Sequence, residues 1–478
     1  MASLRFVPTV SSVVKHENAP TQELQRLDGD AIIGSVMTRA ALICQIALSL
    51  VLAFSPAALQ ADDINLPPIL YDSTPVNDLV AQLQKRLDAG EAELRWDEKH
   101  GWLPSLLEAF DIPQSSQLMV FSKTSFQFNK ISPHKPRVLY FNDEAYVGSV
   151  QQGEVLEVST VDPRQGAIFY TLAQKQTNSP KFQRDRNQCL ACHHNHRTQD
   201  VPGYLVRSVF PGSDGNLFLK LGTTSTDHKT EFRERYGGWY VTGHHGAMRH
   251  RGNAIARDDS EQPLDYEAGA NVTDLGPLLN TRPYLTPHSD LAALMVLEHQ
   301  AQMHNYITRA SYEARLANHY DKVWNKILER PDYYQTDISA RRIVSAGEKL
   351  LRYLLFSEEF QLTSPVQGTS DFTREFSSRG PRDSRGRSLR EFDLQTSLFK
   401  YPCSFLIYSE SFAALPPVMR EYVDRRLLEI LRGEDQSPEF AHLTTADRTA
   451  IREILSDTLP GFAEHLREAV KAPEGHVP

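Results

Sequence analysis

The chain has 478 residues, of which 40% are hydrophobic and 23% charged. These fractions are close to those of globular proteins, so collagen-like, coiled-coil and disordered classes are excluded. The 51 Lys and Arg against 60 Asp and Glu give a net charge of −9, without the basic field expected of a nucleic-acid-binding protein. Four cysteines are too few for a disulfide-dense scaffold.

The amino-terminal part is predicted to be removed from the working protein. Residues 1–36 are polar and patternless, which indicates a misassigned extension ahead of a second start at Met37. From Met37 a positive residue, an apolar run over 40–54 and small residues ending at Ala61 form the pattern of a signal peptide. An uncleaved membrane anchor beginning at Met37 is the alternative. Cleavage after Ala61 leaves 478 − 61 = 417 residues, exported to the periplasm or otherwise outside the cytoplasm, with no transmembrane span.

The first half of the mature chain has a short helical part and then a strand-rich part. Apolar spacing over 79–110 predicts two short helices around a polar turn. The following β-rich runs are separated by Asn, Asp, Gly and Pro, which predicts an antiparallel meander. The expected strands are 137–141, 145–150, 155–161 and 167–172, and a further hairpin is expected from 204–210 and 217–221.

Beyond about residue 288 the apolar period becomes helical. Ser289 and Asp290 are expected to cap a long helix that runs to about residue 320. Three more helices are predicted, around 343–354, from Pro417 to a stop at Gly433, and from Thr444 to a stop before Pro460. A Ser-, Gly-, Pro- and Arg-rich stretch over 362–388 is expected to be a loop. The predicted fold class is therefore α+β, with a β-rich central region and a helical C-terminal half.

One short motif carries the chemistry. Cys189-Leu190-Ala191-Cys192-His193 matches C-x-x-C-H, the signature of covalent haem attachment. Two thiols three positions apart can reach both vinyl groups of one porphyrin, and the next residue then directs an imidazole at the iron. We therefore predict one haem c, attached through Cys189 and Cys192, with His193 as axial ligand of the iron. Export supports this prediction, because haem is attached covalently outside the bacterial cytoplasm.

Three other uses of these cysteines fit the sequence less well. A zinc site would need further ligands, but there is no second C-x-x-C, and the remaining mature cysteine, Cys403, is far along the chain. A thioredoxin-like pair would follow a buried strand, whereas residues 181–186 are polar. A disulfide between Cys189 and Cys192 would close a small, strained loop. Cys403 lies in an apolar stretch and is expected to be buried and inert.

The opposite side of the iron has several candidate ligands. The segment 237–253 is rich in Gly, His and aromatic residues, and glycines allow close approach to a flat macrocycle. In order of preference, its candidate distal ligands are His245, His250 and Met248. Two arginines of the same segment are candidate contacts for the haem propionates: Arg249 and Arg251. His299 and Met303, one turn apart on the long helix, form a weaker metal candidate.

At C-L-A-C-H the chain resembles c-type cytochromes. Over 132–141, 197–210, 237–253 and 398–415 it looks like large, poorly characterised bacterial proteins labelled cytochrome c domain-containing. This resemblance implies haem at Cys189 and Cys192 and iron at His193, but no known activity. Small soluble cytochromes carry the motif on an N-terminal helix and supply a downstream methionine. Here strands flank the motif and histidines follow it, so the compact all-helical cytochrome fold is not expected.

These observations favour an exported monohaem electron-transfer protein with an unidentified redox partner. Between residues 181 and 260 there are 12 Lys and Arg against 8 Asp and Glu, a local charge of +4 for an acidic partner or for the propionates. The alternatives are a peroxidase- or oxygenase-type haem enzyme with an open distal side, and a haem-based sensor or binding protein. The expected domains are N-terminal helices plus a meander (62–175), the haem-binding region (176–285) and the helical region (286–478).

Overall fold

The computed structural model describes residues 64–186, 188–258, 260 and 264–462. These residues belong to one compact unit. The predicted extension 1–36 and signal peptide 37–61 lie outside the described residues. Within the described ranges, every helix is too short or too polar to cross a membrane.

A seven-stranded antiparallel sheet forms the centre of the unit, in the order β6-β5-β4-β3-β2-β1-β9. The four strands of the predicted meander are confirmed. The turns form because a side chain satisfies the backbone: Asn142 Oδ1 accepts from the Ala145 N–H at 2.9 Å, and Asp162 Oδ1 from the Gln165 N–H at 2.8 Å. The strands are β1 (Leu118–Val120), β2 (Arg137–Phe141), β3 (Ala145–Ser149), β4 (Val155–Asp162), β5 (Gly166–Ala173), β6 (Phe182–Arg184) and β9 (Trp239–Tyr240).

The second predicted hairpin is only partly correct. Strand β7 (Val206–Ser208) forms where expected, but it pairs with β8 (Thr224–Thr226). The expected second strand is a short 3-10 helix, Leu219–Leu221, preceded by a single bridge between Pro211 and Leu217. The turn after Pro211 therefore reverses the chain as predicted, and the pairing continues a few residues later. The remaining described strands are β10 (Gly243–His244) and β11 (Gln367–Gly368), which pair with each other.

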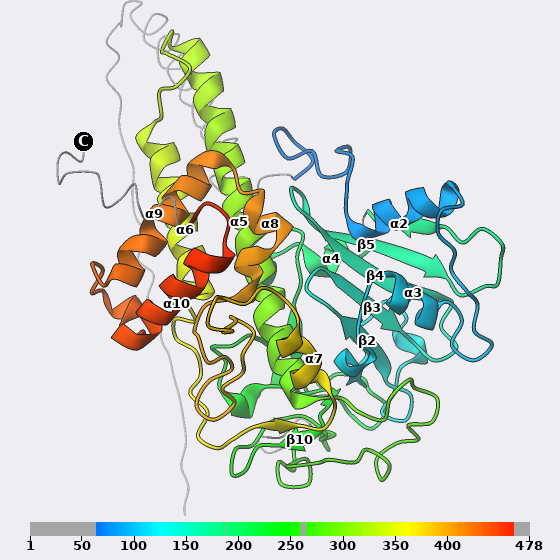
Figure 1. Cartoon of the computed structure of the whole chain (residues 1–478). Coiled ribbons are helices and arrows are strands. Elements are labelled where there is room, and N and C mark those ends of the chain that lie inside the picture. The colour runs from blue at the N-terminus through cyan, green and yellow to red at the C-terminus, as the bar shows by residue number, and fades with distance from the viewer. Residues whose placement is uncertain (1–63, 187, 259, 261–263, 463–478) are drawn as a thin grey trace, which may run out of the picture. The chain divides into compact units, whose positions relative to one another are not determined.

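Helices cover both faces of the sheet (Figure 1). On one face, α2 (Leu79–Asp88) and α3 (Leu103–Ala109) pack over inward-facing side chains such as Tyr140 and Ile168. On the other face lies α5 (Leu291–Ile327), against side chains such as Phe169. The sheet lies between two hydrophobic clusters, one toward α2 and α3 and the other toward α5. Successive side chains of β5 belong to these clusters in turn, because neighbouring residues of a strand point to opposite faces of the sheet. The structure therefore confirms the predicted α+β fold class.

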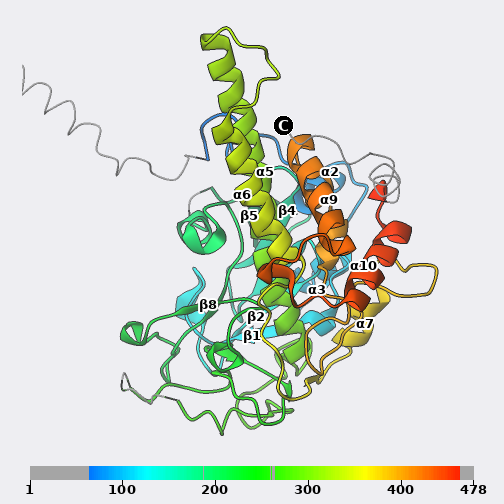
Figure 2. The same ribbon diagram turned by 90° about the vertical axis from the view of Figure 1, so that its left-hand side faces the viewer.

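The C-terminal helices begin and end at the predicted signals. The Asp290 carboxylate accepts from the Ala292 and Ala293 N–H groups at the start of α5, and Gly433 ends α9 in the left-handed region at φ 77°. Thr444 and Asp447 form a capping box at the start of α10. Figure 2 shows α6 beside α5, α9 packed against this pair, and α10 on the far side of α9. Their bounds are α6 Asp337–Leu354, α8 Glu410–Ala413, α9 Pro417–Arg432 and α10 Thr445–Thr458.

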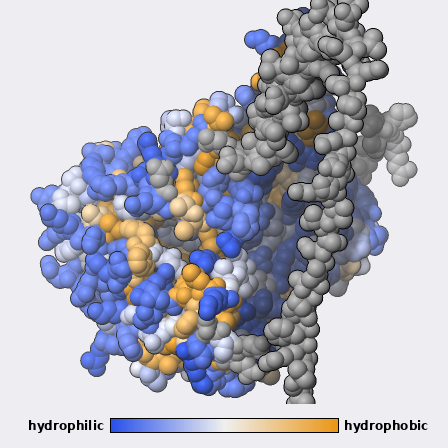
Figure 3. Space-filling view, turned by 180° about the vertical axis from the view of Figure 1, so that it is seen from behind, coloured by the Kyte–Doolittle hydropathy of each residue, from blue (hydrophilic) through white to orange (hydrophobic). Residues whose placement is uncertain are grey.

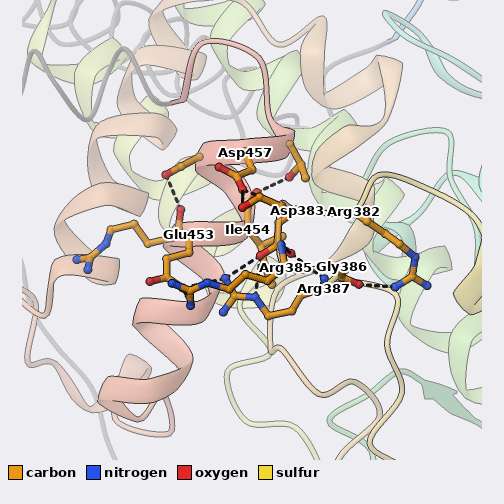
Figure 4. Close-up of polar contacts among 12 residues, drawn as sticks. Arg382, Asp383, Arg385, Gly386, Arg387, Glu453, Ile454 and Asp457 are labelled. Atoms are coloured by element: carbon orange, nitrogen blue, oxygen red, sulfur yellow. Dashed lines mark hydrogen bonds and ion pairs between the residues drawn. The ribbon is translucent and has the colours of Figure 1, made fainter.

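The segment 362–388, predicted as a loop, contains structure of its own. It includes β11 and α7 (Phe372–Ser378). Its end is bound to α10: the Arg387 guanidinium contacts Glu453 at 2.8 Å, and Ser384 donates to Asp457 at 2.6 Å (Figure 4). Arg387 also pairs with the buried Asp383 at 2.7 Å. Side-chain contacts distant in sequence therefore order a stretch whose composition is typical of loops.

Candidate functional site

The C-x-x-C-H motif forms one helical turn on the sheet. Helix α4 (Leu190–His193) follows Cys189, and the His193 N–H donates to the Cys189 carbonyl at 2.9 Å. Positions three and four apart lie on the same side of a helix, so Cys189, Cys192 and His193 share one side. Cys189 is half-buried and Cys192 is exposed. The arrangement presents two thiols and one imidazole to the same region, as covalent haem attachment requires.

The His193 ring is held by a single backbone contact. Its Nδ1 donates to the Gly203 carbonyl at 2.9 Å, which leaves the Nε2 lone pair unbonded among the described residues. Burial holds the pKa of His193 below its usual value, so the ring is neutral at pH 7. The Phe169 ring packs against it, with centroids 4.8 Å apart. A neutral imidazole fixed through Nδ1 is the usual state of a histidine that binds a metal through Nε2.

The contact at Gly203 depends on α5. The Gly203 N–H also donates to the His193 carbonyl at 2.9 Å, so the two residues bind each other twice. A Cβ at Gly203 would lie 2.2 Å from Asn305 Oδ1. That amide oxygen accepts from the Tyr204 N–H at 2.8 Å, and the Asn305 amide donates to the Tyr204 carbonyl at 2.7 Å. The helical half of the chain therefore positions the backbone that orients His193.

Charged groups of the sheet lie near the motif. Burial raises the pKa of the Cys189 thiol to about 12, and the nearby Asp185 carboxylate adds to the shift. Arg137 and Glu157 pair at 2.7 Å, and their charges reach His193 with opposite effects on its pKa. Burial alone would raise the pKa of Glu157, but Arg137, Gln127 and Ser125 outweigh it and lower that pKa. The motif therefore lies beside a compensated ion pair.

Arg207 is a half-buried cation close to Cys192. Burial lowers the pKa of Arg207, the charge of Arg197 lowers it further, and the nearby Cys192 opposes the shift. Its Nε donates to Thr223 Oγ1 at 3.2 Å, and within the described ranges its guanidinium has no carboxylate partner. A guanidinium in this position is suited to a carboxylate of a bound cofactor. Neither Arg137 nor Arg207 stood out from the sequence, because each is a single basic residue in a strand-forming run.

The predicted distal ligands lie in the loop that follows β10, outside the seven-stranded sheet. Arg207 connects this segment with the motif: its side chain is close enough to Cys192 to interact with it, and its carbonyl accepts from Trp239 Nε1 at 2.8 Å. No ring contact, hydrogen bond or charge interaction within the described residues joins His193 to His245, Met248 or His250. Their role as distal ligands stays a prediction.

Each of these residues has a defined environment. His245 Nδ1 donates to the Met248 carbonyl at 2.8 Å and its Nε2 accepts from the Asn271 N–H at 2.9 Å. His250 Nδ1 accepts from the Gly252 N–H at 3.0 Å, while its buried Nε2 has no partner among the described residues. Met248 is a core residue. Among the three candidates, His250 is the one with a ring nitrogen, Nε2, that has no hydrogen-bond partner in the described part of the chain.

The two candidate propionate contacts have protein partners. Arg249 makes two hydrogen bonds to Glu267, at 2.8 and 2.7 Å. Arg251 donates to Thr224 Oγ1 at 3.0 Å and lies over the Phe210 ring. Both guanidinium groups are therefore used within the protein, and their predicted contact with haem stays a prediction.

A second group of ionisable residues is buried between α5 and the segment 226–236. His299 Nδ1 lies 2.9 Å from His228 Nδ1, and its Nε2 lies 2.7 Å from Ser404 Oγ. Glu298 pairs with Arg235 at 3.2 Å, and burial raises its pKa to about 7 although Arg235 opposes the shift. Among the described residues there is no group of three His, Cys, Asp or Glu side chains arranged for a metal. His299 forms hydrogen bonds in the core, and Met303 is a buried core side chain.

The comparisons with known proteins add no family. No protein-family model matches the chain, and neither a curated protein nor a solved structure matches it.

Proposed function

We propose that the protein is an exported monohaem c-type cytochrome that acts in electron transfer. Cys189 and Cys192 would hold the haem through thioether bonds, and His193 Nε2 would bind the iron. The observation that carries the proposal is the His193 ring, whose Nδ1 is bound to Gly203 while Nε2 is free, on the same turn as both thiols. When bound, haem supplies one-electron oxidation and reduction.

The residues around the motif fit such a group. The exposed Cys192 and the half-buried Cys189 give one accessible and one inward attachment point. Arg207 provides a cation without a carboxylate partner in the described part of the chain. The Arg137–Glu157 pair adds no net charge beside the imidazole. Zinc is less well supported, because no group of three His, Cys, Asp or Glu side chains in the described part of the chain is arranged for a metal ion.

The test is expression of the full chain in cells that have a haem-attachment system. Denaturing electrophoresis with haem staining should show covalent haem, and Cys189→Ala with Cys192→Ala should abolish it. The matched control is Cys403→Ala, because Cys403 is a fully buried core residue away from the motif. Failure of the wild-type chain to retain haem after denaturation, with normal folding by circular dichroism, would refute the proposal.

Carbon monoxide separates an electron carrier from a haem enzyme. A reduced protein that does not bind the gas has both axial positions filled, which supports electron transfer. Ready binding would overturn the carrier proposal in favour of the peroxidase- or oxygenase-type alternative. Single changes of His245, Met248 and His250 to Ala then test the distal ligand, since loss of the true ligand converts low-spin iron to high-spin iron.

A further inference from the structure

Two surface loops of the sheet half carry exposed large apolar side chains. Leu219 is 78% exposed, and Phe126 and Phe128 are 47% exposed each. None of the three belongs to a hydrophobic cluster of the described residues. From behind, the described surface is mainly hydrophilic with apolar patches between (Figure 3). Single exposed apolar residues are common, so the question is whether these three lie around one site.

The two phenylalanines lie on a loop, residues 123–130, that is bound to Glu157. Ser125 Oγ donates to Glu157 Oε1 at 2.5 Å, and Gln127 Nε2 donates to the same oxygen at 2.9 Å. Phe126 lies between these two donors in the chain, and Phe128 follows them. The position of both phenyl rings therefore depends on where Glu157 lies.

Glu157 is a near neighbour of the motif histidine. It pairs with Thr171 across β4 and β5, and Phe169, two residues along β5, packs against the His193 ring. Glu157 and Phe169 are thus diagonal neighbours on one face of the sheet, with Cα atoms roughly 7–8 Å apart. The charge of Glu157 accordingly affects the pKa of His193. The loop with the two phenyl rings lies beside the motif.

Leu219 lies on a second loop, residues 217–223, on the other side of the motif cysteines. Thr223, at the end of this loop, accepts at Oγ1 from Arg207 Nε at 3.2 Å. Arg207 is close enough to Cys192 for the two side chains to interact. The second loop is therefore bound to a residue beside the exposed thiol, as the first is bound to a residue beside the imidazole.

Both loops are fixed by contacts that leave their apolar tips outside. The Lys123 N–H donates to the Gly215 carbonyl at 3.0 Å, which joins the first loop to the chain just before the second. Phe218 and Leu221 pack into a small hydrophobic cluster, and Leu219 between them does not. The exposure of Leu219 is therefore a property of a loop that is packed through its other side chains.

We propose that the loops 123–130 and 217–223 form the walls of the haem site, with Phe126, Phe128 and Leu219 in contact with the porphyrin. This inference rests on the haem proposed above at the C-x-x-C-H motif. Cofactor sites are lined mainly by apolar and aromatic side chains with a few polar groups. A covalently attached ring is favoured over a protein partner as the occupant, because both loops are bonded to charged residues that flank the motif.

The charges of the site also fit this occupant. Haem is a flat apolar ring with two carboxylates at one edge. The Arg207 guanidinium has no carboxylate partner in the described part of the chain, so it can receive a propionate. The Glu157 carboxylate would repel one, but it is already paired with Arg137 at 2.7 Å. Apolar walls, one available cation and a neutralised acid match the chemistry of the ring.

Reversible haemin binding tests the proposal without the thioether bonds. The parent for this experiment is the full chain with Cys189→Ala and Cys192→Ala, which keeps His193 but cannot attach haem covalently. Titration with haemin, followed by the Soret absorption, gives a dissociation constant for this parent. The same titration then compares loop variants made in the parent, and circular dichroism checks that each variant is folded.

Carboxylates on the loops should weaken haemin binding. Phe126→Asp with Phe128→Asp, and separately Leu219→Asp, should each raise the dissociation constant at least about tenfold, because a charged group loses its water on packing against the ring. Tyr333→Asp is the matched control, since Tyr333 is 89% exposed at the apex of the α5–α6 hairpin, between these two helices, and should leave binding unchanged. Loop variants that bind as tightly as the parent, or a control that is weakened equally, would overturn the proposal.

Hydrogen exchange of the wild-type chain gives a second measurement. Amides of 123–130 and 217–223 should exchange more slowly in the haem-loaded protein than in the haem-free protein, and those of 331–333 should not change. Equal exchange in a protein that stains for haem would overturn this inference and leave the proposed function standing. The reverse result is no covalent haem in the wild type but haemin binding that depends on the loop residues. It would support the site and refute covalent attachment.

Discussion

At the scale of single residues, the orientation of His193 depends on a residue without a side chain. Gly203 binds His193 through its carbonyl and its N–H group, and it has room to do so only because it lacks a Cβ. Asn305 fills the space where that Cβ would lie. The position of the imidazole is therefore set by packing between a loop of the sheet half and helix α5.

Replacing Gly203 by Ala tests this arrangement. The new Cβ would lie within 2.2 Å of Asn305 Oδ1, so the loop has to shift and the His193 hydrogen bond weakens. We expect a loss of about 1–3 kcal/mol in the free energy of unfolding, measured by urea denaturation. In the haem-loaded protein, the reduction potential should also change, since the Nδ1 contact sets the basicity of the ligand.

Gly276→Ala is the control for this substitution. A Cβ at Gly276 would lie 3.1 Å from Oδ1 of Asp274, an exposed side chain whose hydrogen bond from the Gly276 N–H at 2.8 Å tolerates a small shift. Unchanged stability and unchanged potential are expected. Equal effects of Gly203→Ala and Gly276→Ala would contradict the role assigned to Gly203.

The sequence is sufficient to find the motif but not its surroundings. Cys189, Cys192 and His193 are adjacent in the chain, so their spacing alone predicts a shared side of one turn. Phe169, Gly203 and Asn305 come from a strand, a loop and a helix far apart in sequence. No local pattern distinguishes these residues from other members of their elements, because only the fold brings them to the motif.

At the scale of elements, local turn chemistry decides which predictions hold. The four meander strands are connected by short turns whose Asn and Asp side chains bind the backbone, and all four are correct. Strands β6 and β9 join the same sheet, and β8 pairs with β7. The sequence around β6, β8 and β9 has no turn pattern as clear as the Asn and Asp turns of the meander. Short strands that pair across long connections are stabilised by tertiary contacts, which periodicity does not record.

The segment 362–388 is the element where composition misleads most. Its Arg387 joins the buried Asp383 to Glu453 of α10, while Arg385 contacts the same glutamate from an exposed position (Figure 4). Arg387→Gln leaves Asp383 without its ion pair, and we expect a loss of about 2 kcal/mol in unfolding free energy. Arg385→Gln is the matched control and should change stability by less than about 0.5 kcal/mol. Chemical denaturation at pH 7 measures both, and equal losses would contradict the assignment.

The same contact predicts a pH dependence. The hydrogen bonds from Arg387 and its backbone lower the pKa of Asp383, although burial opposes them. A carboxylate with a lowered pKa in the folded state stabilises the fold above its unfolded pKa and loses that contribution as the pH falls. The stability difference between wild type and Arg387→Gln should therefore be largest near pH 7 and decrease toward pH 3. A difference that grows on acidification would have the wrong sign.

At the scale of the whole molecule, the sheet and the helical half depend on each other. Gln300 of α5 donates to the Asn142 carbonyl at 2.9 Å, and Tyr312 donates to the Gln165 carbonyl at 2.9 Å. One hydrophobic cluster also runs from the sheet through α5 to α10. We expect that a chain cut at 285/286, between the regions predicted from sequence, yields two pieces that lack near-ultraviolet circular dichroism when made separately.

A cut at the apex of the α5–α6 hairpin is the control for this experiment. The backbone at 331–333 is exposed, and the hydrophobic clusters contain none of these residues. A protein nicked there should keep its native spectrum, because the helices on both sides remain packed against the body. Two independently folded pieces from the 285/286 cut would instead mean that the regions are separate domains.

The unequal exposure of the two motif cysteines has a consequence for how the protein matures. In the structure, Cys192 is open to solvent, whereas the Cys189 thiol is half-buried with its pKa raised to about 12. A thiol that stays protonated is a poor nucleophile. In an oxidising compartment the haem-free chain therefore presents one reactive sulfur, which favours mixed disulfides at Cys192 over an internal bridge. If the motif takes up haem as proposed, the accessible Cys192 would form the first thioether and the half-buried Cys189 the second.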